Sequence, residues 1–190
     1  ILPNLSKHIQ SKNKKKINFI QNKALELSIF LSLPAAAALI IASEEITSSL
    51  FGYGSFDSLS VKSSAKALFY FALGLPAFSL IKIFSSFLFA RHNTKIPFYF
   101  SLASVLLNIL ISIYFFNKVG FIIIPIATTI SSWFNSALLL FFLSKKKYFS
   151  LNSNLIYPFV KIISGTTLVS LFFYSMVNLF SDYSFYKAFS

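Results

Sequence analysis

Lys82, Asn108 and Asn135 are polar residues that lie deep within long apolar stretches of this chain. A lysine at the centre of a bilayer costs about 2.5–3.5 kcal/mol, so its ammonium either reaches back to the headgroups or lines a polar cavity. In a cavity it would bind an anionic headgroup, such as a phosphate. An asparagine amide in lipid must find a partner on another helix or in a hydrated cavity. The residue types therefore predict these three as candidates for a substrate cavity, with headgroup contact and interhelical hydrogen bonding as the alternatives.

The sequence contains no set of residues typical of a catalytic site. The chain has no Ser/His/Asp set within reach, no pair of carboxylates in an apolar stretch and no phosphate-binding glycine loop. It has no cysteine, which excludes disulfides and thiolate chemistry. His8 and His92 lie in separate basic segments, so a zinc site is not expected. We predict a protein that is not an enzyme, with no catalytic residues, metal or cofactor.

Long apolar stretches must position the three polar residues. A helix needs roughly 20 apolar residues to cross the hydrocarbon core of a bilayer. Apolar residues make up 56% of the chain and charged residues 12%, a balance that favours a membrane protein over a soluble domain. The pattern predicts an all-α, polytopic transmembrane bundle of about five helices. The stretches are Leu27–Ser43, Ala65–Phe89, Ile96–Asn117, Val119–Ser144 and Ile162–Ser181.

Basic residues gather in alternate gaps between these stretches. Eleven lie in the first, third and fifth gaps, and four lie in the gaps between them. The positive-inside rule then predicts that the N-terminus is cytoplasmic and the C-terminal tail is outside. The predicted organisation is a cytoplasmic basic loop over 1–23, four transmembrane helices over 24–144, and a basic loop, one further helix and an outer tail over 145–190.

The net charge of +12 would suggest nucleic acid as the partner of a soluble protein. Here the lysines flank apolar stretches, for example Lys14, Lys15 and Lys16 before the first of them. Such clusters contact anionic lipid surfaces. We therefore expect anionic phospholipids, and no nucleic acid, as partners of the Lys-rich loops.

Two loops carry motifs whose residues suit structural roles. One runs Leu50-Phe51-Gly52-Tyr53-Gly54-Ser55-Phe56, and the other runs Ala90-Arg91-His92-Asn93-Thr94-Lys95-Ile96-Pro97. The glycines permit the positive φ of a tight return, and the aromatic rings suit the membrane surface. Thr94 is expected to cap the next helix, with Pro97 in its first turn. Arg91 and Lys95 are expected to anchor the inner surface, where they could meet phospholipid or diphosphate. The residues given structural roles are Leu50, Phe51, Gly54, Phe56, Arg91, Thr94 and Pro97.

With Leu2-Pro3-Asn4-Leu5-Ser6 and Leu33-Pro34-Ala35-Ala36, these loops resemble the MurJ/MviN family of lipid II flippases. That family, in the multidrug/oligosaccharidyl-lipid/polysaccharide exporter superfamily, shows a Leu-Phe-x-x-Gly-x-Phe loop and an Ala-Arg-x-x-Thr-x-x-Pro loop. It also shows a Leu-Pro-x-Leu-Ser exit from its eighth helix. Trp133-Phe134-Asn135 is similar to the family's twelfth-helix pattern. The motifs follow the family's order over nearly the whole chain.

The resemblance implies that the stretches are like helices nine to thirteen of a fourteen-helix fold. In that fold two six-helix lobes surround a central cavity, and two further helices form a groove for the lipid tail. The implied function is translocation of lipid II, the undecaprenyl-diphosphate-linked peptidoglycan precursor, across the bacterial cytoplasmic membrane by alternating access. The family's essential arginines belong to its first lobe and seventh helix, so none is assigned here.

The chain starts at Ile1 rather than Met, and we expect it to be a fragment whose partner is the N-terminal lobe of the same protein. Two other interpretations stay open. One is a related transporter: a polysaccharide-lipid flippase, such as one for O-antigen or teichoic acid, or a drug antiporter. The other is a non-transporting membrane scaffold that recruits cell-wall enzymes through its Lys-rich loops. A scaffold would bury Lys82, Asn108 and Asn135 in protein contacts, whereas a transporter would leave them around a hydrated cleft.

Overall fold

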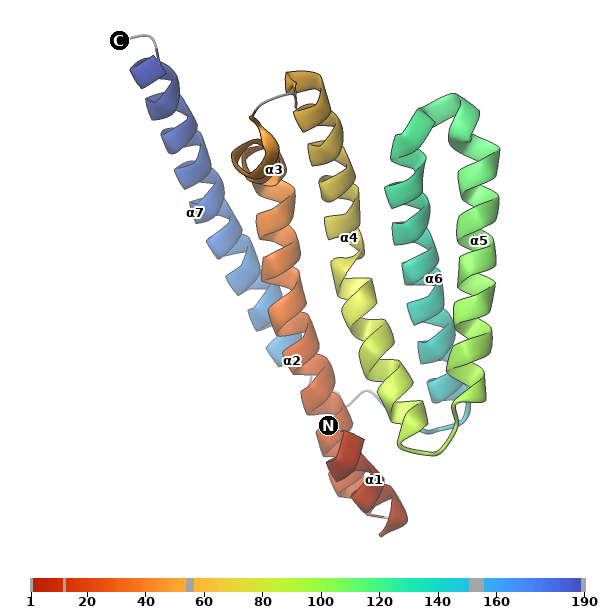
Figure 1. Ribbon diagram of the computed structural model, residues 1–190. Helices are drawn as coiled ribbons and strands as arrows, with labels where there is room; N and C mark the ends of the chain where they lie inside the picture. Colours follow the sequence, from red (N-terminus) through yellow and green to blue (C-terminus); the bar gives the residue numbers. More distant parts are fainter. Residues whose placement is uncertain (1, 12, 54–56, 151–155, 189–190) are drawn as a thin grey trace.

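The computed structural model describes residues 2–11, 13–53, 57–150 and 156–188, with side chains described only for 157–179 in the last range. Every regular element in these ranges is helical (Figure 1), which confirms the all-α prediction. The elements are α1 (Leu2–Gln10), α2 (Lys14–Ile41), α3 (Ser43–Phe51), α4 (Ser58–Phe89), α5 (Lys95–Val119), the 3₁₀ turn η1 (Gly120–Ile122), α6 (Ile123–Lys145) and α7 (Ile156–Ala188).

Four helical stretches of the described chain are long and apolar enough to cross a membrane: Lys14–Ile41, Ser58–Phe89, Lys95–Lys145 and Tyr157–Leu179. The third is a hairpin, because α5 ends at Val119 and the chain turns back through η1 into α6 (Figure 1). The predicted apolar stretches thus fall in α2, α4, α5, α6 and α7. A polytopic bundle is confirmed.

The polar ends of the helices extend further than the sequence pattern predicts. The expected basic loop over 1–23 is largely helical, because it contains α1 and the first turns of α2. The side chain of Asn13 caps α2 by accepting a hydrogen bond from the Lys16 backbone N–H at 3.2 Å. At the other end of the bundle, Asp57 caps α4 by accepting from the Ser60 N–H at 2.8 Å. Each cap satisfies a backbone donor that has no partner within its helix.

The central helix of the bundle is α4, which packs against α2 on one side and α6 on the other. In contrast, α5 packs almost entirely against α6 and barely contacts α4, although the two helices are consecutive. The last helix, α7, packs mainly against α2 and leans away from it (Figure 1). This arrangement leaves one face of α4 and α5 open, and the candidate site lies there.

The apolar core lies at one end of the bundle, where α1, α2, α4 and α6 meet the connection that follows α6. Its large side chains are fully or almost fully buried, and the Phe149 ring lies 5.7 Å from that of Phe87. Burying such side chains contributes about 1.5–3 kcal/mol each. The core includes Leu5, Leu25, Phe84, Phe87, Leu88, Leu139, Leu143 and Phe149.

Pro76 lies inside α4 and removes one backbone donor from that helix. Close to it, α6 donates two hydrogen bonds to backbone carbonyls of α4. Thr129 Oγ1 donates to Tyr70 O at 2.6 Å, and the Trp133 indole donates to Leu73 O at 3.2 Å. Gly74 permits this close approach, because a Cβ there would lie 3.0 Å from Thr129 Oγ1. These contacts fix α6 against α4, and α5 packs on another side of α6.

Candidate functional site

A cavity of about 300 Å³ lies between α4, α5 and α6, and seven of its nine lining residues have polar side chains. We call it the polar notch. The side chains come from one face of α5 and the facing side of α6, which meet because α5 packs on α6. The polar notch is lined by Ile81, Ser101, Ser104, Val105, Asn108, Thr128, Ser131, Ser132 and Asn135.

Two of the predicted candidates, Asn108 and Asn135, share the polar notch. The Asn108 amide donates to Thr128 Oγ1 at 3.0 Å and to Ser131 Oγ at 3.4 Å, across the contact between α5 and α6. The Asn135 amide donates back to Ser101 Oγ at 3.4 Å. Both asparagines therefore join two helices and line a cavity at the same time, so the sequence alternatives are not exclusive.

The carbonyl oxygen of the Asn135 side chain is buried, and no described residue donates a hydrogen bond to it. Only 6% of this residue is exposed. An unsatisfied buried acceptor costs about 1–3 kcal/mol. Beside the polar notch, Asn135 thus keeps a buried acceptor that has no partner among the described residues.

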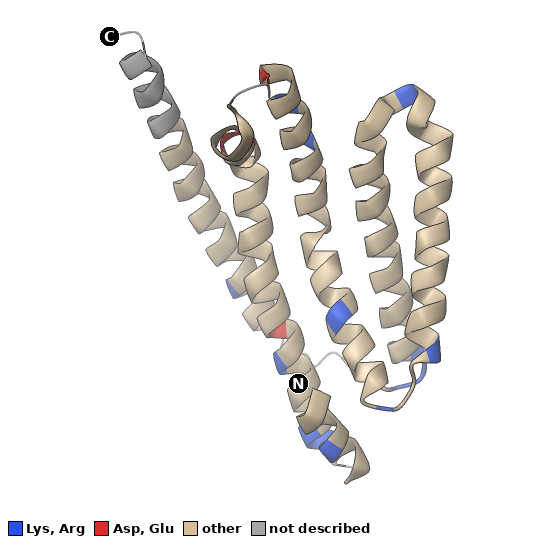
Figure 2. Cartoon of the chain, viewed as in Figure 1, with Lys and Arg blue, Asp and Glu red and all other residues tan. Residues whose placement is uncertain are grey.

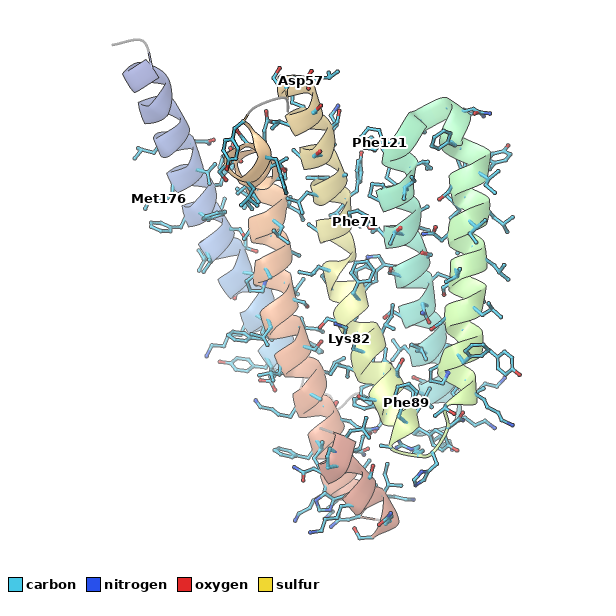
Figure 3. The ribbon with its side chains drawn as sticks, viewed as in Figure 1. Asp57, Phe71, Lys82, Phe89, Phe121 and Met176 are labelled. Carbon is cyan, nitrogen blue, oxygen red and sulfur yellow. The ribbon has the colours of Figure 1, made fainter. Side chains whose placement is uncertain are left out.

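A larger opening of about 960 Å³ adjoins the polar notch, nearer the end of the bundle that holds the apolar core. We call it the lysine groove. Ile81 and Ser101 line both openings, so the two lie side by side. The third candidate, Lys82, is exposed in this groove and lies on α4 two turns from Phe89 (Figure 3). The lysine groove is lined by Leu2, Ile81, Lys82, Ser85, Ser86, Phe89, Thr94, Lys95, Pro97, Phe98, Tyr99 and Ser101.

Arg91, in the connection between α4 and α5, binds protein groups. Its guanidinium donates to Phe87 O and to Tyr148 O, both at 2.7 Å, and lies 4.8 Å from the centre of the Tyr148 ring. Burial lowers the pKa of this guanidinium, and the nearby Tyr148 opposes the shift. The group stays charged, since arginine is not deprotonated in proteins. These contacts support the structural role expected for Arg91.

Gln21 and Asn22, which the sequence analysis does not single out, hold the connection after α6 from the α2 side. Gln21 is fully buried and donates to Tyr148 O at 3.1 Å, and the Asn22 amide donates to Ser150 O at 3.2 Å. Both residues lie in the segment predicted as a loop. If that segment had been predicted as helix, Gln21 and Asn22 would have been expected on the face of α2 that meets the core.

The structure changes some of the roles predicted for residues of the two loop motifs. Thr94 makes no side-chain cap for α5; Asn93 does, because its Oδ1 accepts from the Ile96 N–H at 3.2 Å. Pro97 lies in the first turn of α5, where the sequence analysis places it, and its side chain is buried. Gly52 has φ −74°, so a positive φ does not explain the glycine at this position. A Cβ there would lie 2.4 Å from Ser48 O, so the lack of a side chain does.

The remaining residues of the first motif are only partly described. Leu50 and Phe51, at the end of α3, are 59% and 58% exposed, which suits the membrane-surface role expected for the Phe51 ring. Gly54 and Phe56 lie outside the described residues.

Charge is distributed unevenly along the bundle. Lys and Arg gather at the end that carries α1 and the connections after α4 and α6, whereas Glu44, Glu45 and Asp57 lie at the opposite end (Figure 2). Glu26 is nearer the basic end and pairs with Lys23 at 2.9 Å. Hydrogen bonds from the side chain and backbone of Ser60 lower the pKa of Asp57. No group of three His, Cys, Asp or Glu side chains that could hold a metal occurs among the residues described.

Long apolar helices, polar groups buried between them and basic residues gathered at one end define a multi-pass α-helical membrane protein. The family model for the lipid II flippase MurJ matches residues 1–189. The chain belongs to the MurJ family of lipid II flippases, which confirms the resemblance seen in the sequence.

This chain is similar to two relatives in sequence and to one solved structure in fold. A probable lipid II flippase MurJ of Rickettsia prowazekii is 31% identical over 188 residues, which cover 96% of this chain and 37% of the relative. One of Rhizobium meliloti is 37% identical over 139 residues, or 73% of this chain and 26% of the relative. A structure of the lipid II flippase MurJ in an inward closed conformation superposes with a TM-score of 0.73 at 28% identity, covering 97% of this chain and 42% of that one. The chain thus spans well under half of these proteins.

Proposed function

We propose that this chain is part of a transporter that moves lipid II from the cytoplasmic to the outer leaflet of the bacterial cytoplasmic membrane. The observation that carries the proposal is the family match over residues 1–189, which the likeness to a MurJ structure supports at a TM-score of 0.73. Members of this family are transporters by name, so the reaction is movement of a lipid rather than a chemical conversion.

The polar notch and the lysine groove carry polar and cationic groups suited to a lipid with a large polar head. In this proposal the buried acceptor of Asn135 and the amide of Asn108 meet hydroxyl and amide groups of the headgroup. Lys82, in the adjoining lysine groove, contacts the diphosphate. Hydrogen bonds to charged groups contribute about 1.5–3 kcal/mol each, enough to hold a diphosphate in position.

The proposal requires a second lobe. The chain spans 37% of one relative and 42% of a matched structure, and alternating access moves one bundle against another around a shared site. We propose that an N-terminal lobe supplies the other wall of the cavity. The basic end would face the cytoplasm, where its lysines contact anionic phospholipid.

Depletion of the full-length protein tests this function. We expect lipid II to accumulate on the cytoplasmic side and to fall in the outer leaflet, measured by an outer-leaflet probe of lipid II in intact cells. Repletion with the wild-type protein should restore the outer pool, which controls for indirect effects on lipid II synthesis. If depletion leaves the distribution of lipid II unchanged, the proposed function is wrong.

A further inference from the structure

The two ends of the bundle differ in how firmly their helices are packed. The largest fully buried side chains of the described chain all lie at the basic end. At the other end, which carries Glu44, Glu45 and Asp57 and which we call the acidic end (Figure 2), the buried apolar side chains are alanines together with Val61 and Ile123. A buried alanine removes less apolar surface from its surroundings than a leucine or phenylalanine does. The acidic end is therefore held together less firmly than the basic end.

Two neighbouring helices each carry a proline at nearly the same depth. A hydrogen bond of 2.6 Å between the hydroxyls of Ser28 and Ser79 fixes the register of α2 and α4, which run in opposite directions (Figure 1). From this pair toward the acidic end, Pro34 of α2 lies roughly 9 Å away and Pro76 of α4 roughly 4 Å away, at 1.5 Å per residue. Each proline removes a backbone donor from its helix. The backbones of α2 and α4 are thus both weakened on the acidic side of the serine pair.

A glycine weakens α4 further at this depth. Gly74 precedes Pro76 by two residues, and glycine favours a helix less than alanine does. Helices that contain proline or glycine bend at these residues rather than elsewhere. The segment Gly74–Pro76 therefore divides α4 into an acidic half, residues 58–73, and a basic half, residues 77–89.

The neighbouring helix α6 has no comparable weak point. It contains no glycine, and Pro125, its one proline, lies in the first turn, where no hydrogen bond within the helix is lost. At the basic end, Leu139 and Leu143 of α6 are fully buried in the apolar core. Helix α6 is therefore a continuous rod that is fixed at the basic end and reaches the acidic end.

Two side chains of α6 hold the acidic half of α4. The hydroxyl of Thr129 donates to Tyr70 O at 2.6 Å, and the indole of Trp133 donates to Leu73 O at 3.2 Å. Both acceptors lie on the acidic side of Pro76. These hydrogen bonds join neutral groups and can open without uncovering the apolar core, which lies at the opposite end.

We propose that α4 is hinged at Gly74–Pro76, and that Thr129 and Trp133 of α6 are the latch that holds the hinge in its present position. When both hydrogen bonds open, the acidic half of α4 swings away from α6. It carries α3 with it, because α3 packs on α4, and it bends α2 at Pro34, because α3 follows directly on α2 (Figure 1). The basic end and the hairpin of α5 and α6 keep their positions.

The latch lies beside the polar notch. Thr128, Ser131 and Ser132 line the notch, and they alternate along α6 with Thr129 and Trp133. A swing of the acidic half of α4 consequently gives the polar notch an opening toward the acidic end. The inference goes beyond the proposed function, because the movement takes place within one bundle and depends neither on a second lobe nor on the identity of the transported lipid.

Distances between spin labels in the full-length protein, reconstituted in lipid, test the hinge. One pair replaces Leu59 of α4 and Tyr114 of α5 by labelled cysteines and spans the acidic end, and the other replaces Phe19 of α2 and Phe98 of α5 and spans the basic end. All four side chains are at least 59% exposed, so labels fit without repacking. Any other cysteine in the full-length protein is first replaced by serine. Double electron–electron resonance then gives the distribution of separations for each pair.

Removal of the latch should lengthen the separation at the acidic end alone. Thr129→Val and Trp133→Phe each remove one donor and keep the shape of the side chain. Each should raise the ratio of long to short separations roughly fivefold, which corresponds to about 1 kcal/mol per hydrogen bond. Thr167→Val is the matched control, because the Thr167 hydroxyl donates only to Ile163 O of its own helix, and it should leave both distributions unchanged.

Removal of the hinge should reverse the effect. Pro76→Ala restores the backbone donor of α4, so in the Thr129→Val, Trp133→Phe background it should return the acidic-end pair to short separations. An acidic-end distribution that stays unchanged when the latch is removed would overturn the proposal. Equal lengthening of both pairs, or long separations that persist with Pro76→Ala, would also overturn it.

Hydrogen exchange of the unaltered protein provides a measurement that no substitution can disturb. We expect backbone amides of the acidic half of α4 to exchange at least tenfold faster than those of its basic half, because the hinge opens one half and not the other. Equal protection of the two halves would contradict the hinge. Circular dichroism of each labelled variant verifies that the helices persist.

Discussion

At the residue scale, the carbonyl oxygen of Tyr148 connects parts of the chain that are distant in sequence. It accepts hydrogen bonds from Arg91 after α4 and from Gln21 on α2. Beside it, the Phe149 ring packs on Phe84 and Phe87 in the core. The connection after α6 is therefore held by both polar and apolar contacts, and Arg91 contributes one hydrogen bond and the contact with the Tyr148 ring.

Replacing Arg91 tests this role. Arg91→Ala should destabilise the bundle by about 1–3 kcal/mol, since it removes two charged donors and the stacking on Tyr148. Arg91→Lys should recover only part of the loss, because an ammonium cannot reproduce the planar fork. Thermal unfolding in detergent, followed by circular dichroism, measures both. Lys146→Ala, an exposed basic residue at the same end, should leave the midpoint unchanged. A midpoint for Arg91→Ala equal to that of the wild type would contradict the role.

The two asparagines of the polar notch distinguish a transporter from a scaffold. These 190 residues contain no cysteine, so a single cysteine at position 108 or 135 is their sole thiol, and any cysteine elsewhere in the full-length protein is first replaced by serine. In the full-length protein, Asn108→Cys and Asn135→Cys should react with a membrane-impermeant, water-soluble thiol reagent, because a hydrated cavity admits water to the polar notch. Ala127→Cys, at a position that is fully buried, should stay unreactive. Lack of reaction at both asparagine positions would favour the scaffold.

The candidate residues differ in how visible they are in the sequence. Asn108 and Asn135 stand out because an amide among apolar residues has few alternatives to an interhelical partner. Lys82 was predicted in the same cavity but lies in the adjoining lysine groove, because the pairing of α5 with α6 decides which faces meet. Asn93 and Thr94 are both suitable caps, and only the backbone path through His92 selects Asn93.

At the element scale, Gly120 makes the hairpin between α5 and α6 possible. Its backbone has φ 73° and ψ −155°, a region that only glycine adopts without strain. Gly120→Ala should destabilise the bundle by about 1–3 kcal/mol through backbone strain, since no atom lies within 4 Å of the added Cβ.

Gly165→Ala is the matched substitution. Gly165 lies within α7, also has open space around its Cβ position and has no positive φ. The change should be neutral or stabilise by about 0.5–1 kcal/mol, because alanine favours a helix over glycine. Thermal unfolding of both variants decides the matter, and equal effects would refute a conformational role for Gly120.

The sequence predicts the helices well where apolar residues are continuous, and it predicts their polar ends less well. Apolar stretches located α4, α5, α6 and α7 to within several residues of one end or both. The sequence analysis does not predict α1 or the first turns of α2. Both are rich in basic residues, which indicated a loop, and tertiary contacts stabilise them as helices. Asn13 and Asp57 are cap residues that would have marked the true starts of α2 and α4.

At the scale of the whole molecule, large apolar surfaces have no protein cover within the described chain. Side chains of α5 that face away from α6, such as Ile113 and Tyr114, are 71% and 70% exposed. On α7, Leu168 and Phe172 are exposed to a similar extent. In a membrane, lipid or further helices cover these faces at little cost. The fold therefore permits a second bundle to pack beside this one without rearrangement of the core.

We expect the isolated 190-residue chain to insert as a helical bundle but not to move lipid II. Its polar notch and lysine groove open between three helices on one side, and no second wall encloses them in the described chain. A headgroup there would meet hydrocarbon on its open side, where each unsatisfied polar group costs several kcal/mol. Reconstitution in liposomes with labelled lipid II, beside a full-length family member as the positive control, measures the rate. Circular dichroism on the same liposomes verifies that the bundle is folded. Transport by the isolated chain at the rate of the full-length control would show that one bundle suffices.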